Sequence, residues 1–336
     1  MSYFVRRTGQ AIFTVFAVIS LSFGIVRLLP GGPADYLRAQ LIQQGGTISQ
    51  AQLNQRIAAQ TNLAPDKPLH LQYVDYIWQV LHLDFGTSIW YNQPVTEILG
   101  PAIPWTVFLM ATALFIQFVI GVSLGAFMAY REGSRFDVGS TAVSLISNSI
   151  PFYVIGLLLI TFLGYRMELF PTGGRYASGN AVALTNPDFL LSVLYHGTLP
   201  ILSLVIASFG GWALTMRGNS IRILGEDYLR VARLRGLSER RIAFRYVGRN
   251  AILPMYTGLL IAIGFMFGGS VILEKIFAYP GVGYYLIQSI GQRDYPVMMG
   301  AFMLIAVAVT VGVFIADLTY GYVDPRAKGG QNSESY

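Results

Sequence analysis

The chain contains six apolar runs, and each is long enough to cross a membrane as a helix. Crossing about 30 Å of hydrocarbon takes roughly 20 helical residues. Polar segments of uneven length separate the runs. The sequence therefore predicts an all-α integral membrane protein with six transmembrane helices, placed at approximately Ala11–Leu29, Trp105–Ala129, Val138–Leu163, Thr198–Met216, Ile252–Ile272 and Val297–Tyr320.

Composition supports a membrane protein and excludes several kinds of site. Charged residues make up 12% of the chain and hydrophobic residues 54%, whereas a soluble domain carries about 25% charged residues. There is no cysteine, which excludes disulfides, thiolate nucleophiles and cysteine metal sites. The three histidines all lie outside the apolar runs. The net charge of +6 comes from loops beside the runs, which indicates membrane topology rather than a nucleic-acid surface.

The distribution of charge predicts that both termini are cytoplasmic. Lys and Arg outnumber Asp and Glu in the segments that this assignment places inside, but not in those that it places outside. Arg6 and Arg7 precede the first run, as in a signal peptide. However, the run is longer than a typical signal core, and no small-x-small cleavage site follows it. We therefore expect the first run to be retained as a membrane helix.

We expect four segments: an N-terminal transmembrane helix (1–30), a sizeable external segment (31–104), a core transmembrane domain (105–325) and a cytoplasmic tail (326–336). The core domain contains a long cytoplasmic loop, 217–251. The external segment is either a simple cap or a landing surface for an external protein. Pro68 suits the first turn of a helix there, and apolar residues recur at helical spacing after it, namely Leu69, Tyr73, Tyr76, Ile77 and Val80.

Most of the cytoplasmic loop belongs to an arginine-rich stretch that runs from Glu226 to Pro254. Its pattern predicts two short helices joined at Gly236, with acids at the start of the first and arginines near its end. Ser238 is placed to cap the second helix, and Pro254 marks the expected entry into the next membrane helix. The stretch is either a basic loop that contacts anionic lipid or a docking element. Its arginines, of which the last three repeat every four residues, are Arg230, Arg233, Arg235, Arg240, Arg241, Arg245 and Arg249.

The order of residues in this stretch resembles a known family. Ala232, Gly236 and the ending Ile252-Leu253-Pro254 resemble the cytoplasmic coupling loop of ABC-importer permeases. The segment 227–241 is similar to the dipeptide/oligopeptide/nickel permease family. At 27–34 Gly32 replaces the family's aspartate. The resemblance extends from about Tyr3 to Lys328, and its matching motifs are spread along the chain at 27–34, 66–68, 72–73, 84–88, 149–152, 171–174, 277–283, 294–296, 317–320 and 324–326.

The resemblance implies a type I ABC importer permease fold and a multi-pass protein of the cytoplasmic membrane. Such a chain would form half of a translocation path for dipeptides or oligopeptides, or alternatively for an oligosaccharide or a nickel complex. Its partners would be a second permease, two ATPase subunits and an external substrate-binding protein, with membrane lipid around it. No cofactor is expected in this chain; ATP and Mg would bind the ATPases, since no G-x-x-x-x-G-K-[ST] motif occurs. The implied ATPase-coupling residues are Asp227, Tyr228, Ala232, Arg233, Arg235, Gly236, Leu237, Ser238, Arg240 and Arg241.

A few residues within the apolar runs invite a second interpretation. Ser147, Asn148 and Pro151 form either a packing kink or a polar lining of the translocation path. The glycines Gly264, Gly268 and Gly269 are expected to permit close helix packing. Asp317 is the only acid in a predicted span, near its cytoplasmic end, where we expect a structural role. An ion-coupled secondary transporter would need such a group at the midplane, and a membrane-embedded enzyme would need a catalytic constellation in the spans.

Overall fold

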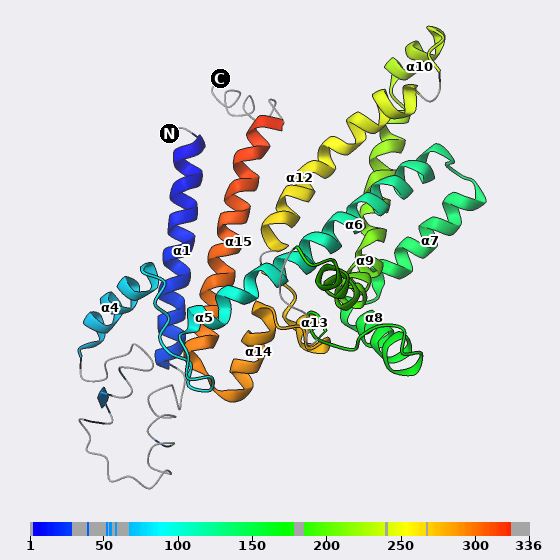
Figure 1. Ribbon diagram of the computed structural model, residues 1–336. Coiled ribbons are helices and arrows are strands. Elements are labelled where there is room, and N and C mark those ends of the chain that lie inside the picture. The colour runs from blue at the N-terminus through cyan, green and yellow to red at the C-terminus, as the bar shows by residue number, and fades with distance from the viewer. Residues whose placement is uncertain are drawn as a thin grey trace, which may run out of the picture. The chain divides into compact units, whose positions relative to one another are not determined.

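The computed structural model describes residues 3–28, 67–177, 185–238, 241–266 and 268–323, with a few isolated positions between 39 and 58. In these ranges the regular structure is helical (Figure 1) apart from one isolated β-bridge between Thr87 and Pro94. The chain divides into two compact units. Unit 1 comprises Met1–Val107, Phe267–Lys275 and Tyr279–Ile315, and unit 2 comprises Phe108–Met266, Ile276–Ala278 and Ala316–Tyr336.

Unit 1 is built around two clusters of buried apolar side chains. Its helices are α1 (Tyr3–Leu28), α4 (Leu69–Leu81), α5 (Val95–Leu99), the 3₁₀ turn η1 (Gly100–Ala102), most of α13 (Val271–Ile276), α14 (Val282–Gln292) and most of α15 (Tyr295–Val323). In one cluster, Val95 and Ala102 pack against Val297 and Ala301 of α15, all with no exposed surface. The segment formed by α5 and η1 is thereby fixed to the start of α15.

The second cluster joins α4 to α1 and α15. The side chains of Tyr76 and Val80 are buried with Phe23 of α1 and Met303 of α15. The helix predicted from Leu69 onward is thus confirmed. Pro68 precedes it as the N-cap, with φ −56° and ψ 145°, rather than lying in its first turn.

Unit 2 is organised around one very long helix, α9 (Pro187–Leu224), which has 38 residues. It packs against α7 (Arg135–Ser149), α8 (Phe152–Leu159) and α12 (Arg249–Met266). The remaining elements are most of α6 (Ile103–Tyr130), the π-helix η2 (Ile160–Arg166), α10 (Asp227–Leu234) and the π-helix η3 (Ile242–Gly248). At 1.5 Å per residue α9 is about 57 Å long, so it extends well past a hydrocarbon core of about 30 Å.

Four helices in the described part of the chain are long and apolar enough to span a membrane, or five if one bent pair counts as a span. The four are Val95–Tyr130, Pro187–Leu224, Arg245–Met266 and Tyr295–Thr319, at the predicted second, fourth, fifth and sixth spans. The predicted third span is the bent pair: α7 and the segment Phe152–Arg166 meet at 92° around Pro151. The first predicted span falls on α1, a helix of 26 residues.

Two expectations about the fifth span are wrong. Its helix ends at Met266, and Gly269 lies beyond it with φ +66°, so Gly268 and Gly269 belong to a turn and not to a helix-packing face. Pro254 does not mark the helix entry either, because α12 begins at Arg249 and Pro254 lies inside it. Pro254 therefore removes one backbone donor from α12, six residues after η3 ends at Gly248.

Candidate functional site

The first of the two short helices predicted in the arginine-rich loop is confirmed as α10, whereas the second is not separate, because η3 runs directly into the long helix α12. Asp227 is the first residue of α10, where a carboxylate suits the positive end of the helix dipole, and Arg233 lies in its last turn. Both side chains are exposed. The two ends of α10 therefore lie where the charge pattern of the sequence predicts them.

Gly236 ends α10 with a Schellman motif. Its φ is +73°, its N–H donates to the carbonyl of Arg233 at 2.9 Å, and the Leu237 N–H donates to the carbonyl of Ala232 at 3.3 Å. These are the two hydrogen bonds that define the motif, and the left-handed residue is normally glycine. A Cβ placed on Gly236 would meet nothing within 4 Å. The requirement for glycine here is conformational and not steric.

One face of α10 is buried and the other is free of packing within unit 2. Leu229 has no exposed surface and Ala232 is 4% exposed, because both lie in a cluster with Ile242 and Met255. On the opposite face Leu234 is 81% exposed. Val231 is 52% exposed and Tyr228 42% exposed beside it. The sequence reasoning missed Val231 and Leu234; their i, i+3 spacing was the available signal.

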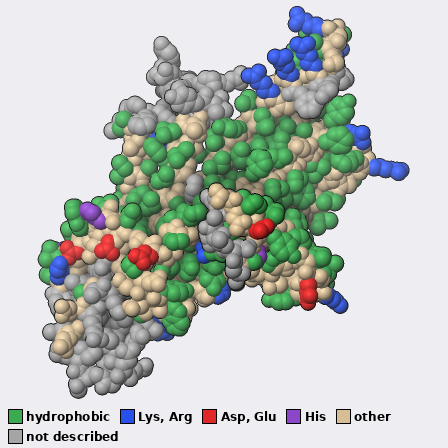
Figure 2. Space-filling model, viewed as in Figure 1, with side chains coloured by type: hydrophobic (Ala, Val, Ile, Leu, Met, Phe, Trp, Pro, Cys, Tyr) green, Lys and Arg blue, Asp and Glu red, His purple; other side chains and the backbone are tan. Residues whose placement is uncertain are grey.

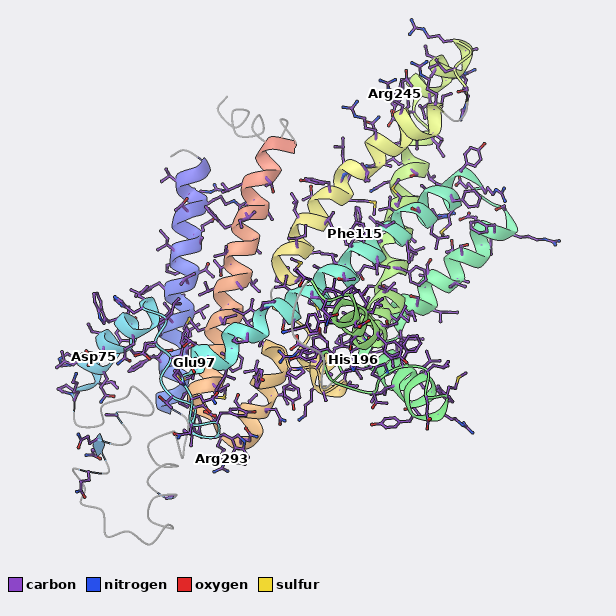
Figure 3. All side chains as sticks on the ribbon, viewed as in Figure 1. Asp75, Glu97, Phe115, His196, Arg245 and Arg293 are labelled. Carbon is purple, nitrogen blue, oxygen red and sulfur yellow. The ribbon has the colours of Figure 1, made fainter. Side chains whose placement is uncertain are left out.

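Basic side chains surround this exposed apolar face. Figure 2 shows Lys and Arg side chains gathered at the end of unit 2 that carries α10, and Arg245 is labelled there in Figure 3. Ser238 is exposed, and its carbonyl accepts a hydrogen bond from Ile242 N at 3.0 Å. Glu239 and Arg240 lie outside the described residues, so the predicted Ser238 cap stays a prediction. The exposed arginines are Arg230, Arg233, Arg235, Arg241, Arg245 and Arg249.

The last part of α9, which leads into α10, is tied to the start of α7 by a partly buried ion pair. Arg217 donates from Nε to Asp137 Oδ1 at 2.6 Å and from Nη2 to Oδ2 at 2.7 Å. Asp137 is 2% exposed and also accepts from the Gly133 N–H at 3.0 Å. The sequence reasoning did not pair these two residues, which are 80 positions apart. The pair links the start of α7 to α9, and α10 follows α9 after the turn at Gly225.

The α7–α8 break does not gather its three predicted residues on one surface. Ser147 is 6% exposed, and its hydroxyl donates to the carbonyl of Ile206 in α9. Asn148 is exposed, and Pro151 is the exposed N-cap of α8 with φ −58°. Ser147 thus fastens the break to α9, whereas Asn148 and Pro151 are left exposed.

Unit 1 contains a buried carboxyl group that the sequence reasoning did not single out. Glu274 has no exposed surface. It accepts from Thr106 Oγ1 at 2.9 Å and from the Tyr284 N–H at 3.0 Å. Thr106 Oγ1 also accepts from the Val282 N–H at 2.9 Å. A Cβ on Gly281 would lie 2.5 Å from Glu274 Oε2, so only glycine fits this turn. Burial raises the pKa of Glu274 from 4.5 to about 7, against the opposing effect of its hydrogen bonds.

Comparison with known proteins gives consistent matches over most of the chain. A family model described as the binding-protein-dependent transport system inner membrane component matches residues 121–329. The oligopeptide transport system permease protein AppB of Bacillus subtilis (strain 168) is 35% identical over 97% of this chain and 98% of its own length. The dipeptide transport system permease protein DppB of Escherichia coli (strain K12) is 30% identical over 98% of this chain and 99% of its own length.

The fold also has a solved neighbour. A chain of the MetNI methionine ABC transporter in inward-facing conformations aligns with a TM-score of 0.52 and 18% identity. The alignment covers 68% of this chain and 97% of that chain. The likeness supports the arrangement of helices alone, because the sequence identity is low.

Proposed function

This chain belongs to the family of binding-protein-dependent transport system inner membrane components, and on that premise we propose that it is a permease subunit of an ATP-driven peptide importer. It has six transmembrane helices with both termini in the cytoplasm and forms half of the translocation path. Dipeptides or oligopeptides are the proposed substrates, because the similar relatives are named for them. The second half comes from another permease, and an external binding protein delivers the substrate.

The observation that carries the coupling part of the proposal is the geometry of α10. Its buried residues, Leu229 and Ala232, fix it to unit 2, while Val231 and Leu234 are left exposed among arginines. An exposed apolar pair with a charged rim is the composition expected of a protein-binding patch. We assign this face to a groove on a separate ATPase subunit, which binds ATP and Mg.

The contacts of α10 and α9 suggest how ATPase closure is transmitted to the membrane helices. When the ATPases close, they push on α10, and the push passes into α9 through the short turn at Gly225. Arg217 and Asp137 fasten α9 to the start of α7, and Ser147 fastens the other end of α7 to α9, so the force passes along α7 to the α7–α8 break. Asn148 and Pro151 at that break are proposed to line the translocation path. The two ATPase states thus bias the permease between two conformations.

Two experiments test the proposal. Mild-detergent purification of the tagged chain should recover a second permease, ATPase subunits and a binding protein. The ligand retained by that binding protein then identifies the substrate as a peptide, an oligosaccharide or a nickel complex. Gly236→Leu should abolish transport while the assembled complex still hydrolyses ATP. Gly236→Asn is the matched control, since asparagine tolerates positive φ. Normal transport by Gly236→Leu would refute the docking role, and recovery of the chain alone would indicate a self-sufficient, ion-coupled transporter.

A further inference from the structure

The external helix α4 has apolar side chains on two faces, and only one of them is packed. Tyr76 and Val80 are buried against α1 and α15. The opposite face carries Leu71, Val74, Trp78 and Leu81, which are 46%, 60%, 66% and 64% exposed. Their spacing places them in one stripe along the helix. A helix with its outer face in water would carry polar residues there.

Polar groups border this apolar stripe on both sides. His70 lies along one edge, and Asp75 and His82 lie along the other. Asp75 pairs with Lys67 at 2.5 Å, and the side chains of Lys67 and Asp75 are 50% and 41% exposed. Asp75 is labelled in Figure 3, on the edge of α4 away from α1. An apolar stripe with polar borders is the pattern of a helix that lies in the plane of a membrane interface.

Contacts with α1 measure the depth of α4. No charged residue occurs between Arg7 and Arg27. As a helix this segment is about 30 Å long, which matches the thickness of the hydrocarbon core. The hydroxyls of Ser20 and Tyr73 are hydrogen-bonded at 2.6 Å, and the rings of Phe23 and Tyr73 lie 5.4 Å apart. Ser20 and Phe23 come before Arg27 by about 10 and about 6 Å of helix.

Contacts with α15 give a second, independent measure. Met303, and beside it Met299, pack in the same cluster as Tyr76 and Val80. The charged residues Arg293 and Asp294 directly precede this helix, which begins at Tyr295. Met299 and Met303 follow Tyr295 by about 6 and about 12 Å of helix. Both helices therefore place the contacts of α4 about 6 to 12 Å inside the outer charged boundary. Interfacial helices bury their apolar faces to a similar depth, about 5–10 Å.

We infer that α4 lies in the outer-leaflet interface, with Leu71, Val74, Trp78 and Leu81 in contact with the acyl chains of membrane lipids. This rests on the proposed topology, in which α1 crosses the membrane with its N-terminus in the cytoplasm. Figure 1 shows α4 beside the C-terminal half of α1, which is the external half in that topology. Trp78 lies where tryptophan is favoured, at the boundary between headgroups and hydrocarbon. The helix then anchors the external segment at the membrane surface and keeps its Lys67–Asp75 edge in water.

Spin labelling of the full-length chain tests this inference, because the chain has no native cysteine. Single variants Val74→Cys, Trp78→Cys and Leu81→Cys carry a nitroxide, and the labelled chain is reconstituted in phosphatidylethanolamine and phosphatidylglycerol vesicles. Power saturation measures how often the nitroxide collides with oxygen, which dissolves in lipid, and how often it collides with a nickel chelate, which stays in water. The two collision rates are then compared at each position. Asp75→Cys on the polar edge is the water control. Phe16→Cys, exposed on α1, is the deep-lipid control.

The expected result is that oxygen collisions exceed nickel collisions at the three stripe positions, at a depth between those of Phe16 and Asp75. Nickel collisions that dominate at the stripe, with Phe16 still in lipid, would place α4 in water and overturn the inference. If collisions with both oxygen and nickel were suppressed at the stripe positions, protein would be covering the stripe. That result would also overturn the inference. Nickel access at Phe16 would instead show that the proposed topology fails, which separates the two failures.

Discussion

Arg217 of α9 holds Asp137 of α7 through two parallel hydrogen bonds, from Nε at 2.6 Å and from Nη2 at 2.7 Å. The geometry matches the planar fork of a guanidinium to the two oxygens of a carboxylate. The Asp137 N–H itself donates to Ser134 Oγ at 3.2 Å, so the same residue is part of the cap of α7. One ion pair thus fixes both the start of α7 and the end of α9 that leads to α10.

Loss of the Arg217 side chain should destabilise the protein strongly. Arg217→Ala leaves Asp137, which is 2% exposed, as a buried charge without its partner, and such changes cost about 3–5 kcal/mol. We expect a lower midpoint of thermal unfolding in detergent, followed by tryptophan fluorescence. Arg217→Lys keeps the charge but not the fork, and should fall between Arg217→Ala and the unmodified chain. Arg222→Ala removes an exposed arginine from the same helix and should leave the midpoint unchanged; an equal drop there would contradict the role of the pair.

The contact between α9 and α7 at Gly210 should not tolerate a methyl group. A Cβ on Gly210 would overlap the Ser144 carbonyl oxygen and lie 2.9 Å from Ser144 Cα, which are backbone atoms and cannot rotate away. Gly210→Ala should therefore lower the thermal midpoint by separating the two helices. Gly218 lies in the same helix with nothing within 4 Å of its built Cβ. Gly218→Ala should be neutral or stabilising by about 0.5–1 kcal/mol, because alanine favours a helix. Similar losses in both variants would refute this explanation.

The exposed face of α10 should matter for assembly and not for the stability of the chain. Leu234 is 81% exposed, whereas Leu229 in the same helix is fully buried. Leu234→Ala should reduce recovery of the ATPase subunit on the tagged chain and leave the thermal midpoint unchanged. Leu229→Ala creates a cavity and should cost about 2–5 kcal/mol. The docking assignment would be wrong if Leu234→Ala recovered the ATPase normally.

The turn around Glu274 should become less stable as the pH rises. The pKa of Glu274 is raised from 4.5 to about 7 by burial, so between these values the folded state binds more protons than the unfolded state. Stability from this group is therefore fully present below 4.5 and is lost as the pH rises through about 7.

Amide exchange of Val282 and Tyr284 measures this effect, because both N–H groups bind within the Glu274–Thr106 cluster. Their protection factors, corrected for the intrinsic pH dependence of exchange, should fall across the same pH range. In Glu274→Gln the side chain cannot ionise, so the two protection factors should lose this pH dependence. A persistent pH dependence in Glu274→Gln would assign the effect to another group.

Features that depend on neighbouring residues were predictable from the chain. The α10–Gly236 turn is one, since its two defining hydrogen bonds join residues three and five positions apart. The helix from Leu69 and the break at Pro151 are others, because apolar spacing and a missing N–H act locally. The family resemblance, carried by the order of such local motifs, was confirmed by the comparisons.

Tertiary structure decided which polar groups were buried together and which apolar side chains were left exposed. Asp137 and Arg217 are 80 positions apart, and Thr106 and Glu274 are 168 apart; no local pattern specifies such pairs. Whether Ser147 lines a path or binds α9 depended on how close two helices come, which Gly210 permits. The sequence by itself determined the apolar runs, the turns and the position of the basic loop, because these follow from composition and backbone preference. Only packing determined which side chains meet, because burial is a property of the assembled helices.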